Sequence, residues 1–243
     1  MNLVIFPHAG GGTAFYHNWK KIFEKYFSVL IIQYPMREHK SGVPMPPTLV
    51  DLAREIFEQN KDIFLTDFIV WGHSFGSTLA YEVLKIVQSE VNRSAVLFFS
   101  SGASAPCNQS RQLPLNIAKD DKVLVKRLKK IGGIPQRMYL NKEYMDYYLP
   151  IISADIDLLV GYRDLSLERI KCPLVLLLGT EDEIDLANWE QYAEVLDIKF
   201  FEGGHFFFEN NPEIFENQVI NQLYKYNLKK RTSTGGENDA KYK

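Results

Sequence analysis

Ser74 lies in a pattern of residues that can make a serine hydroxyl into a nucleophile. Residues 72–76 read Gly-His-Ser-Phe-Gly, which matches the G-x-S-x-G sequence of a nucleophile elbow. The apolar run at 68–71 predicts a buried strand before the elbow, and apolar residues at helical spacing from 79 to 87 predict a helix after it. The helix N-terminus would direct its N–H groups and positive dipole end at charge developing beside Ser74. Glycine is expected at both ends of the elbow because side chains there would crowd the adjoining strand and helix.

His205 is the candidate base. A serine hydroxyl is a poor nucleophile, so it needs a base to take its proton and a third group to orient that base. The expected order along the chain is serine, acid, histidine, and His205 is the only histidine after the elbow. It lies at 202–206 in Glu-Gly-Gly-His-Phe, directly after a predicted strand, where two glycines free the backbone to place the ring. The alternative is a histidine packed among the phenylalanines at 206–208.

The orienting acid should lie between the serine and the histidine, at the end of a strand. The predicted strand at 174–178 leads into Gly-Thr-Glu-Asp-Glu-Ile-Asp at 179–185. The order strand, glycine, two residues, aspartate favours Asp182, and Asp185 is the alternative. Glu181 and Glu183 are expected to be solvated charges of the loop.

Two backbone N–H groups should hold the oxyanion that forms during acyl transfer. The residue after the nucleophile supplies one, which predicts the Phe75 N–H. The glycine-rich turn at 7–12 follows the first predicted strand, and its Ala9 N–H is the predicted second donor. A phosphate-binding loop is disfavoured because this turn lacks both G-x-G-x-x-G and the Lys-Ser/Thr pair of a P-loop. The spacing of cysteines and histidines predicts no metal site, and we expect no cofactor.

Composition limits the classes of function. A net charge of −2, without a basic stripe interleaved with aromatic residues, gives no case for nucleic-acid binding. No run of about 20 apolar residues predicts a membrane span, and the N-terminus lacks the pattern of a signal peptide. The two cysteines, Cys107 and Cys172, are expected to be reduced thiols, which fits a cytoplasmic protein.

Strand and helix patterns alternate along the chain of 243 residues. This alternation predicts an α/β fold with a mostly parallel sheet covered by helices on both faces. Residues 106–170 break the rhythm with helical patterns, and we expect them to form a helical cap over the active site. We predict one domain at 1–228 and a disordered tail at 229–243. The predicted strands are 3–6, 29–32, 68–71, 95–99, 174–178 and 198–201, and a helix is predicted at 48–64.

The remaining aromatic and histidine residues receive structural interpretations. His73 is expected to pack inside the protein and His8 to line the entrance of the site. His17 and His39 are expected at the surface. The tyrosine pair at 147–148 would line an acyl channel or pack within the cap, and the sequence leaves both possibilities open.

Several short stretches are similar to motifs of one known family. Residues 34–38 read Tyr-Pro-Met-Arg-Glu and resemble its Tyr-Pro-Gly-Arg motif, with Met36 in place of glycine. Residues 149–155 read Leu-Pro-Ile-Ile-Ser-Ala-Asp and resemble its Leu-Pro-x-x-Arg-Ala-Asp, with Ser153 in place of arginine. The other similar stretches are 6–11, 72–76, 101–106, 131–135 and 203–206. Together these motifs resemble the type II (external) thioesterases of nonribosomal peptide and polyketide synthesis.

The resemblance implies an α/β-hydrolase fold and a role in antibiotic biosynthesis. The enzyme would hydrolyse stalled or aberrant acyl groups from the phosphopantetheine arm of acyl- or peptidyl-carrier proteins, and we expect a monomer. The alternatives are a fatty-acyl thioesterase, a small-ester esterase or lipase, and an acyltransferase. A binding module with an inactive hydrolase fold is an alternative of another class.

Overall fold

The computed structural model describes the chain except residues 110–112, 165, 211 and 235–243. It divides into two units, residues 1–207 and 208–243. The first unit holds the sheet, its covering helices and the predicted active-site residues. The second contains most of the short helix α9 (Phe207–Asn210) and all of the long helix α10 (Pro212–Thr234). Because α10 continues to Thr234, helix extends into the stretch from residue 229 that we expected to be disordered, while residues 235–243 lie outside the described part.

Six strands form one sheet in the order β2-β1-β3-β4-β5-β6, and every neighbouring pair is parallel. The predicted α/β fold is therefore confirmed. The last strand begins four residues before the predicted strand at 198. Its first residues, Glu-Val-Leu-Asp at 194–197, are only partly buried at the edge of the sheet, and their pairing with β5 includes a register shift, so they lack a regular strand pattern. The strands are β1 (Asn2–Phe6), β2 (Ser28–Ile31), β3 (Phe68–His73), β4 (Phe98–Ser101), β5 (Pro173–Gly179) and β6 (Glu194–Phe201).

The helix predicted at 48–64 is interrupted at Asn60. Its first part begins after Thr48, whose hydroxyl accepts a hydrogen bond from the Asp51 N–H as an N-cap. Asn60 leaves the helical conformation, and its side chain donates to the Ile56 carbonyl, which ends the first part. The helices of the main unit are α1 (His17–Phe23), α2 (Leu49–Gln59), α3 (Lys61–Phe64), α4 (Phe75–Val91), α5 (Pro106–Gln109), α6 (Asp121–Ile131), α7 (Lys142–Gly161) and α8 (Trp189–Tyr192), with 3-10 turns η1 (Glu38–Lys40) and η3 (Gln136–Leu140).

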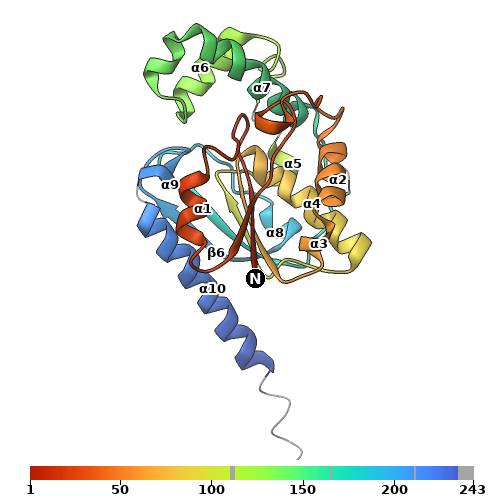
Figure 1. Ribbon diagram of the computed structural model, residues 1–243. Coiled ribbons are helices and arrows are strands. Elements are labelled where there is room, and N and C mark those ends of the chain that lie inside the picture. Colours follow the sequence, from red (N-terminus) through yellow and green to blue (C-terminus); the bar gives the residue numbers. More distant parts are fainter. Residues whose placement is uncertain (110–112, 165, 211, 235–243) are drawn as a thin grey trace, which may run out of the picture. The chain divides into compact units, whose positions relative to one another are not determined.

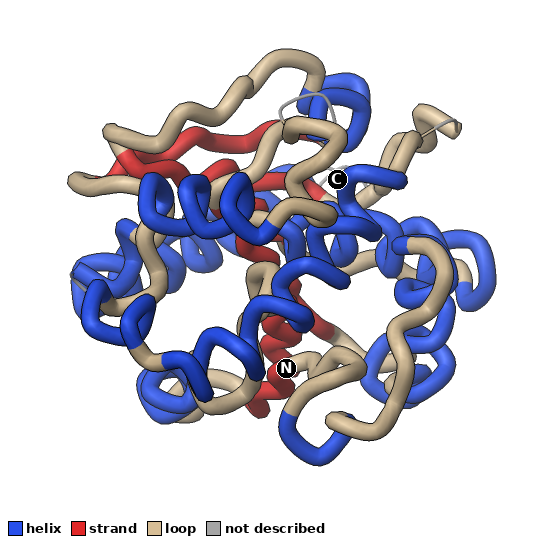
Figure 2. Tube along the Cα trace, turned by 90° about the horizontal axis from the view of Figure 1, so that it is seen from above, coloured by secondary structure: helices blue, strands red, loops and turns tan. Residues whose placement is uncertain are grey.

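Alternate residues of the central strand β3 serve the two faces of the sheet. Phe68 and Val70 are buried in the same apolar cluster as Leu79 of α4. Trp71 points to the other face, where its ring lies 4.6 Å from that of Trp19 in α1. Helices therefore lie on both sides of the strands, as the view from above shows (Figure 2). Burial on both faces explains why the strand is apolar without interruption.

Residues 106–170 join β4 to β5 and contain α5, α6, η3 and α7. Figure 1 shows α6 and α7 together beyond the carboxyl-terminal edge of the sheet. They share a small apolar core that includes Leu124, Leu128 and Ile152. A cap of this kind covers the edge at which the loops of a parallel sheet collect functional residues. No helix within the described residues is both long and apolar enough to cross a membrane.

Candidate active site

Ser74 occupies the turn between β3 and α4, in a backbone conformation that side-chain-bearing residues rarely adopt (φ 55°, ψ −118°). Its N–H donates to the Ser101 carbonyl of the next strand at 2.8 Å, which anchors the turn. A Cβ atom at Gly76 would lie 2.1 Å from the Phe6 carbonyl oxygen, so only glycine lets α4 approach β1 this closely. This crowding was expected from the sequence. The turn presents Ser74 at the start of a helix, beside its unpaired N–H groups.

Asp182 and His205 lie in the loops after the two neighbouring strands β5 and β6. The Asp182 carboxylate is 2.7 Å from Nδ1 of His205, and both side chains are only 8% exposed. Two backbone hydrogen bonds join these loops, from Thr180 N–H to the Phe201 carbonyl and from Glu181 N–H to the Gly203 carbonyl. The loops therefore hold the aspartate and the imidazole together before any substrate arrives.

The alternative acid, Asp185, is engaged elsewhere. One of its carboxylate oxygens accepts from the Asn108 side chain at 2.9 Å, and the other accepts from the Ala187 N–H. The structure thus brings Asp182, and not Asp185, against His205. No hydrogen bond links the Ser74 hydroxyl to His205 among the described residues, although both side chains line one cavity.

The N–H groups of the glycine-rich turn after β1 differ in whether they have an acceptor among the described residues. The His8 N–H lies 3.4 Å from the Tyr16 hydroxyl, the Gly10 N–H donates to Asp155, and the Gly11 N–H donates to the His8 carbonyl. The Ala9 N–H donates to none of the residues that the structure describes. Phe75 is the first residue of α4, where N–H groups lack partners within the helix. The sequence analysis named these two N–H groups as oxyanion donors, and that role stays a prediction.

Arg37 and Asp155 form a buried ion pair that the sequence analysis did not identify. The guanidinium donates to both carboxylate oxygens, at 2.6 and 2.8 Å, and the two side chains are 3% and 0% exposed. Arg37 also donates to the Gly11 carbonyl, and Asp155 accepts from the Gly10 N–H at 2.7 Å. The pair therefore fixes both sides of the turn that carries Ala9. The signal available in the sequence was that both residues fall within family-like motifs.

Glu38 binds the residues that follow this turn. Its carboxylate accepts hydrogen bonds from the Thr13 hydroxyl at 2.6 Å, from the Ala14 N–H at 2.9 Å and from the Gln33 side chain at 2.7 Å. Hydrogen bonds to the carboxylate lower the pKa of Glu38 although partial burial, the largest influence, opposes them.

Met36 has a positive φ of 67°, the conformation that glycine adopts without strain. This conformation explains why glycine stands at the matching place of the family motif.

Two further histidines lie beside the site as expected. His73 is fully buried, its Nδ1 is 2.9 Å from the Ser101 hydroxyl, and its ring centroid is 4.7 Å from that of His205. Burial, reinforced by the neighbouring histidines, lowers its pKa well below 6.5. Burial, together with His205 and Arg37, lowers the pKa of His8 to about 3. Both rings are therefore neutral at pH 7. His17 and His39 are exposed.

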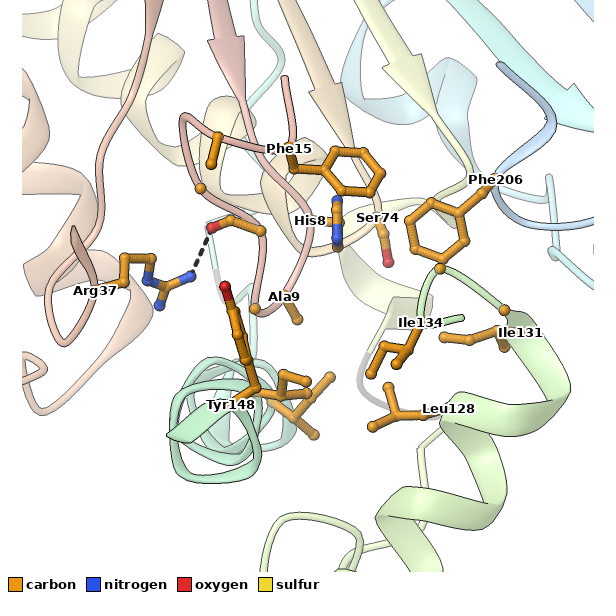
Figure 3. A pocket seen from close by; sticks show the side chains of 18 of the residues that line it. His8, Ala9, Phe15, Arg37, Ser74, Leu128, Ile131, Ile134, Tyr148 and Phe206 are labelled. Carbon is orange, nitrogen blue, oxygen red and sulfur yellow. Dashed lines mark hydrogen bonds between the residues drawn. The ribbon is translucent and has the colours of Figure 1, made fainter. Parts of the chain in front are cut away.

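A cavity of about 250 Å³ adjoins Ser74 and His205 under the cap. Figure 3 shows Leu128, Ile131, Ile134 and Phe206 along one side of it. The turn after β1 and helix α7 form the other side, and Tyr147 and Tyr148 also line it. The tyrosine pair therefore contributes to the cavity wall. A Cβ atom at Gly133 would lie 2.4 Å from the Phe206 ring, so the cap segment before Ile134 fits closely over that ring.

No group of three or more histidine, cysteine, aspartate or glutamate side chains suited to a metal ion occurs among the described residues. A carboxylate lies on one nitrogen of the His205 imidazole, and Ser74 lines the adjoining cavity together with that imidazole. Such an arrangement can perform acyl transfer.

Comparison with known proteins agrees with this chemistry. Residues 1–221 match the family model of the thioesterase domain. The chain is similar to the gramicidin S biosynthesis protein GrsT of Aneurinibacillus migulanus, with 27% identity over 89% of this chain and 86% of that protein. It is also similar to the probable anguibactin biosynthesis thioesterase AngT of Vibrio anguillarum, with 29% identity over 87% of each chain.

Solved structures show the same fold. ClbQ, from the colibactin NRPS/PKS pathway, matches with a TM-score of 0.80 and 23% identity over 93% of this chain and 98% of its own. RedJ, a thioesterase from the prodiginine pathway of Streptomyces coelicolor, matches with a TM-score of 0.78 and 24% identity over 92% of this chain and 84% of its own. With its α/β-hydrolase fold and a family model that spans nearly all of the chain, this protein belongs to the thioesterase domain family and is a thioester hydrolase.

Proposed function

We propose that this protein is a type II thioesterase that removes stalled or aberrant acyl groups from the phosphopantetheine arm of carrier proteins. Three similar proteins support this role: GrsT is named for gramicidin S biosynthesis, AngT for anguibactin biosynthesis, and ClbQ for the colibactin NRPS/PKS pathway. The contact between Asp182 and His205, beside a cavity that also contains Ser74, carries the proposal of a catalytic triad. A cytoplasmic location fits because Cys107 and Cys172 are both free thiols.

Ser74 attacks the thioester carbonyl in the first step. His205 takes the serine proton on Nε2, while Asp182 holds Nδ1–H and stabilises the imidazolium that forms. The carbonyl oxygen becomes an oxyanion, which accepts hydrogen bonds from the Ala9 and Phe75 N–H groups. His205 then returns the proton to the departing thiolate, and the acyl group remains on Ser74 as an ester.

Water completes the reaction. His205 takes a proton from a water molecule, which attacks the ester carbonyl and forms a second oxyanion in the same position. Collapse of this intermediate releases the carboxylic acid and returns the proton to Ser74. The turn after β1 enters both steps with its geometry fixed, because Arg37, Asp155 and Glu38 already bind its backbone and side chains. Such preorganised donors need no rearrangement as charge develops.

The cavity favours short acyl groups over long fatty acyl chains. Its volume of about 250 Å³ lies just below the roughly 300–1,000 Å³ that small-molecule sites usually span. Its cap side is apolar, with Leu128, Ile131 and Ile156 among the lining residues. A short acyl group would remove this surface from water, while the polar arm would remain outside. This favours an editing role over the fatty-acyl alternative.

The test compares three substrates that carry the same acetyl group: a loaded carrier protein, free acetyl-pantetheine and a nitrophenyl ester. We expect kcat/KM to be highest for the loaded carrier protein and lost for Ser74→Ala on all three. Ser89→Ala, at an exposed serine of the adjoining helix α4, is the matched control and should retain activity. Hydrolysis of the ester with no action on the loaded carrier protein would exclude the editing role and leave an esterase.

A fluorophosphonate probe tests the non-enzymatic alternative. The wild-type protein and Ser89→Ala should be labelled, and Ser74→Ala should not. Failure of the probe to label the folded wild type would support a binding module instead. Transfer of the acyl group to an added amine or alcohol in preference to water would identify an acyltransferase.

A further inference from the structure

One face of the cap helix α6 carries a row of lysines. The helix contains five basic residues and one acidic residue. Lys122, Lys126 and Lys129 follow one another at spacings of four and three residues, which places them on the same side of a helix, with Lys130 beside them. All four are exposed. The whole chain has a net charge of −2, so this positive surface is a local feature and not a reflection of composition.

The opposite face of α6 is a wall of the active-site cavity. Leu124 and Leu128 are buried in the apolar core of the cap, and Leu128 and Ile131 line the cavity that contains Ser74. An α-helix with its side chains is roughly 10–12 Å across. A partner seated on the lysine row would therefore lie about one helix diameter from the cavity that the opposite face lines.

Two of the lysines have no partner within the described part of the chain. Lys130 pairs with Glu183 at 2.6 Å, and the Lys129 ammonium lies 5.2 Å from the centre of the Tyr139 ring. The side chains of Lys122 and Lys126 form no ion pair and no hydrogen bond with the described residues. Their charges are available to another molecule.

A polar groove of about 600 Å³ runs between α6 and the loop after β5 and reaches His205. Arg127 and Lys130 line it on the α6 side. The loop opposite carries the carboxylates of Glu181, Asp182, Glu183 and Asp185. Ile131 and His205 line both this groove and the cavity, so the two spaces meet at the imidazole. His205 must protonate the leaving thiolate, so this groove suits the polar, amide-containing arm.

We propose that the lysine row of α6 (Lys122, Lys126, Lys129 and Lys130) docks the carrier protein through an acidic surface of that partner beside its arm. The inference rests on the proposed function and names the surface that selects the substrate. The arm's phosphodiester adds a negative charge on the same side of the partner. Complementary charges speed encounter and fix orientation. A membrane surface fits less well, because the apolar face of α6 is packed inward and cannot enter a bilayer.

The experiment reverses the two unpaired charges with Lys122→Glu/Lys126→Glu. We expect kcat/KM for an acetyl-loaded carrier protein to fall about 10- to 100-fold, in the range that charge steering gives. The value for free acetyl-pantetheine should be unchanged, because the small thioester needs no docking surface. Lys21→Glu/Lys171→Glu, which makes the same charge change at exposed positions outside the cap, is the matched control and should leave both values unchanged.

Added salt and a conservative variant show whether docking depends on the charge of the lysines or on the shape of their side chains. Added salt should lower the wild-type value for the loaded carrier protein and have little effect on Lys122→Glu/Lys126→Glu. Lys122→Arg/Lys126→Arg should behave as wild type. If Lys122→Glu/Lys126→Glu lost kcat/KM equally on both substrates, or lost it on neither, docking at this face would be overturned. Binding of the wild type to phosphatidylglycerol vesicles in competition with the carrier protein would overturn it as well. If wild type fails on the loaded carrier protein but cleaves acetyl-pantetheine, the proposed function fails and the docking surface with it.

Discussion

The Arg37 guanidinium and the Asp155 carboxylate, 118 residues apart, form a buried ion pair with two short hydrogen bonds. The pair joins the loop after β2 to the cap helix α7 and binds the backbone of Gly10 and Gly11 between them. Taking two charges out of water is costly, so such a pair is seldom the most stable solution for a core. Its place beside the predicted oxyanion donor Ala9 points to a positioning role.

Breaking this pair should cost both stability and rate. Asp155→Asn leaves the Arg37 charge buried without its counterion, and we expect a loss of about 3–5 kcal/mol in the free energy of unfolding. The double variant Arg37→Met/Asp155→Leu should recover much of that stability, yet its kcat should stay low because the Gly10 N–H has lost its acceptor. Urea unfolding and steady-state kinetics measure the two quantities. A double variant with wild-type kcat would show that the pair does not position the turn.

The choice between the two candidate acids predicts a contrast in rate. Asp182→Asn should lower kcat about 10⁴-fold, because an amide cannot hold the required tautomer of His205 or stabilise its charge. Asp185→Asn should retain a kcat near that of wild type, since this carboxylate contacts Asn108 and Ala187 instead. Hydrolysis of acetyl-pantetheine by the two variants, at matched protein stability, gives the comparison. The reverse ranking would assign the acid to Asp185.

Gly76 should not tolerate even the smallest side chain. The Cβ atom of Gly76→Ala would lie 2.1 Å from the Phe6 carbonyl oxygen, and both are backbone positions that cannot rotate away. We expect little folded protein, or a loss above the 1–3 kcal/mol typical of overpacking, measured by urea unfolding. Gly42→Ala, where no atom lies within 4 Å of the new Cβ, is the control and should be close to neutral. A stable, active Gly76→Ala would contradict the close approach of α4 to β1.

Buried His73 should make stability depend on pH. In the unfolded chain it takes up a proton as the pH falls below about 6.5, whereas burial lowers its pKa in the folded protein, so protonation favours unfolding. Stability should therefore fall as the pH drops from 6.5, by up to about 1.4 kcal/mol per pH unit for this residue. In His73→Asn the free energy of unfolding should decline less between pH 7 and 5.5. The exposed His17→Asn serves as control. Parallel curves for His73→Asn and wild type would show that folding does not lower the pKa of this ring.

Local sequence patterns were sufficient to predict the features that depend on residues close together in the chain. The elbow around Ser74 combines a buried strand, a strained residue and a helix start within one short stretch, so the sequence specifies it directly. The same holds for the alternation of buried strands and amphipathic helices, from which the parallel sheet followed. Where burial is incomplete the pattern weakens, and the partly exposed start of the edge strand β6 was missed for that reason.

The sequence by itself determined the class of fold and was sufficient to propose Ser74 as nucleophile and His205 as base, because short-range periodicity and residue type carry that information. Only the tertiary structure decided which aspartate meets His205, since Asp182 and Asp185 lie in one loop and differ only in what the neighbouring loops bring to them. For the same reason, the sequence analysis did not identify the Arg37–Asp155 pair. Contacts across more than 100 residues arise from packing of the cap on the sheet, and no local pattern of residues encodes them.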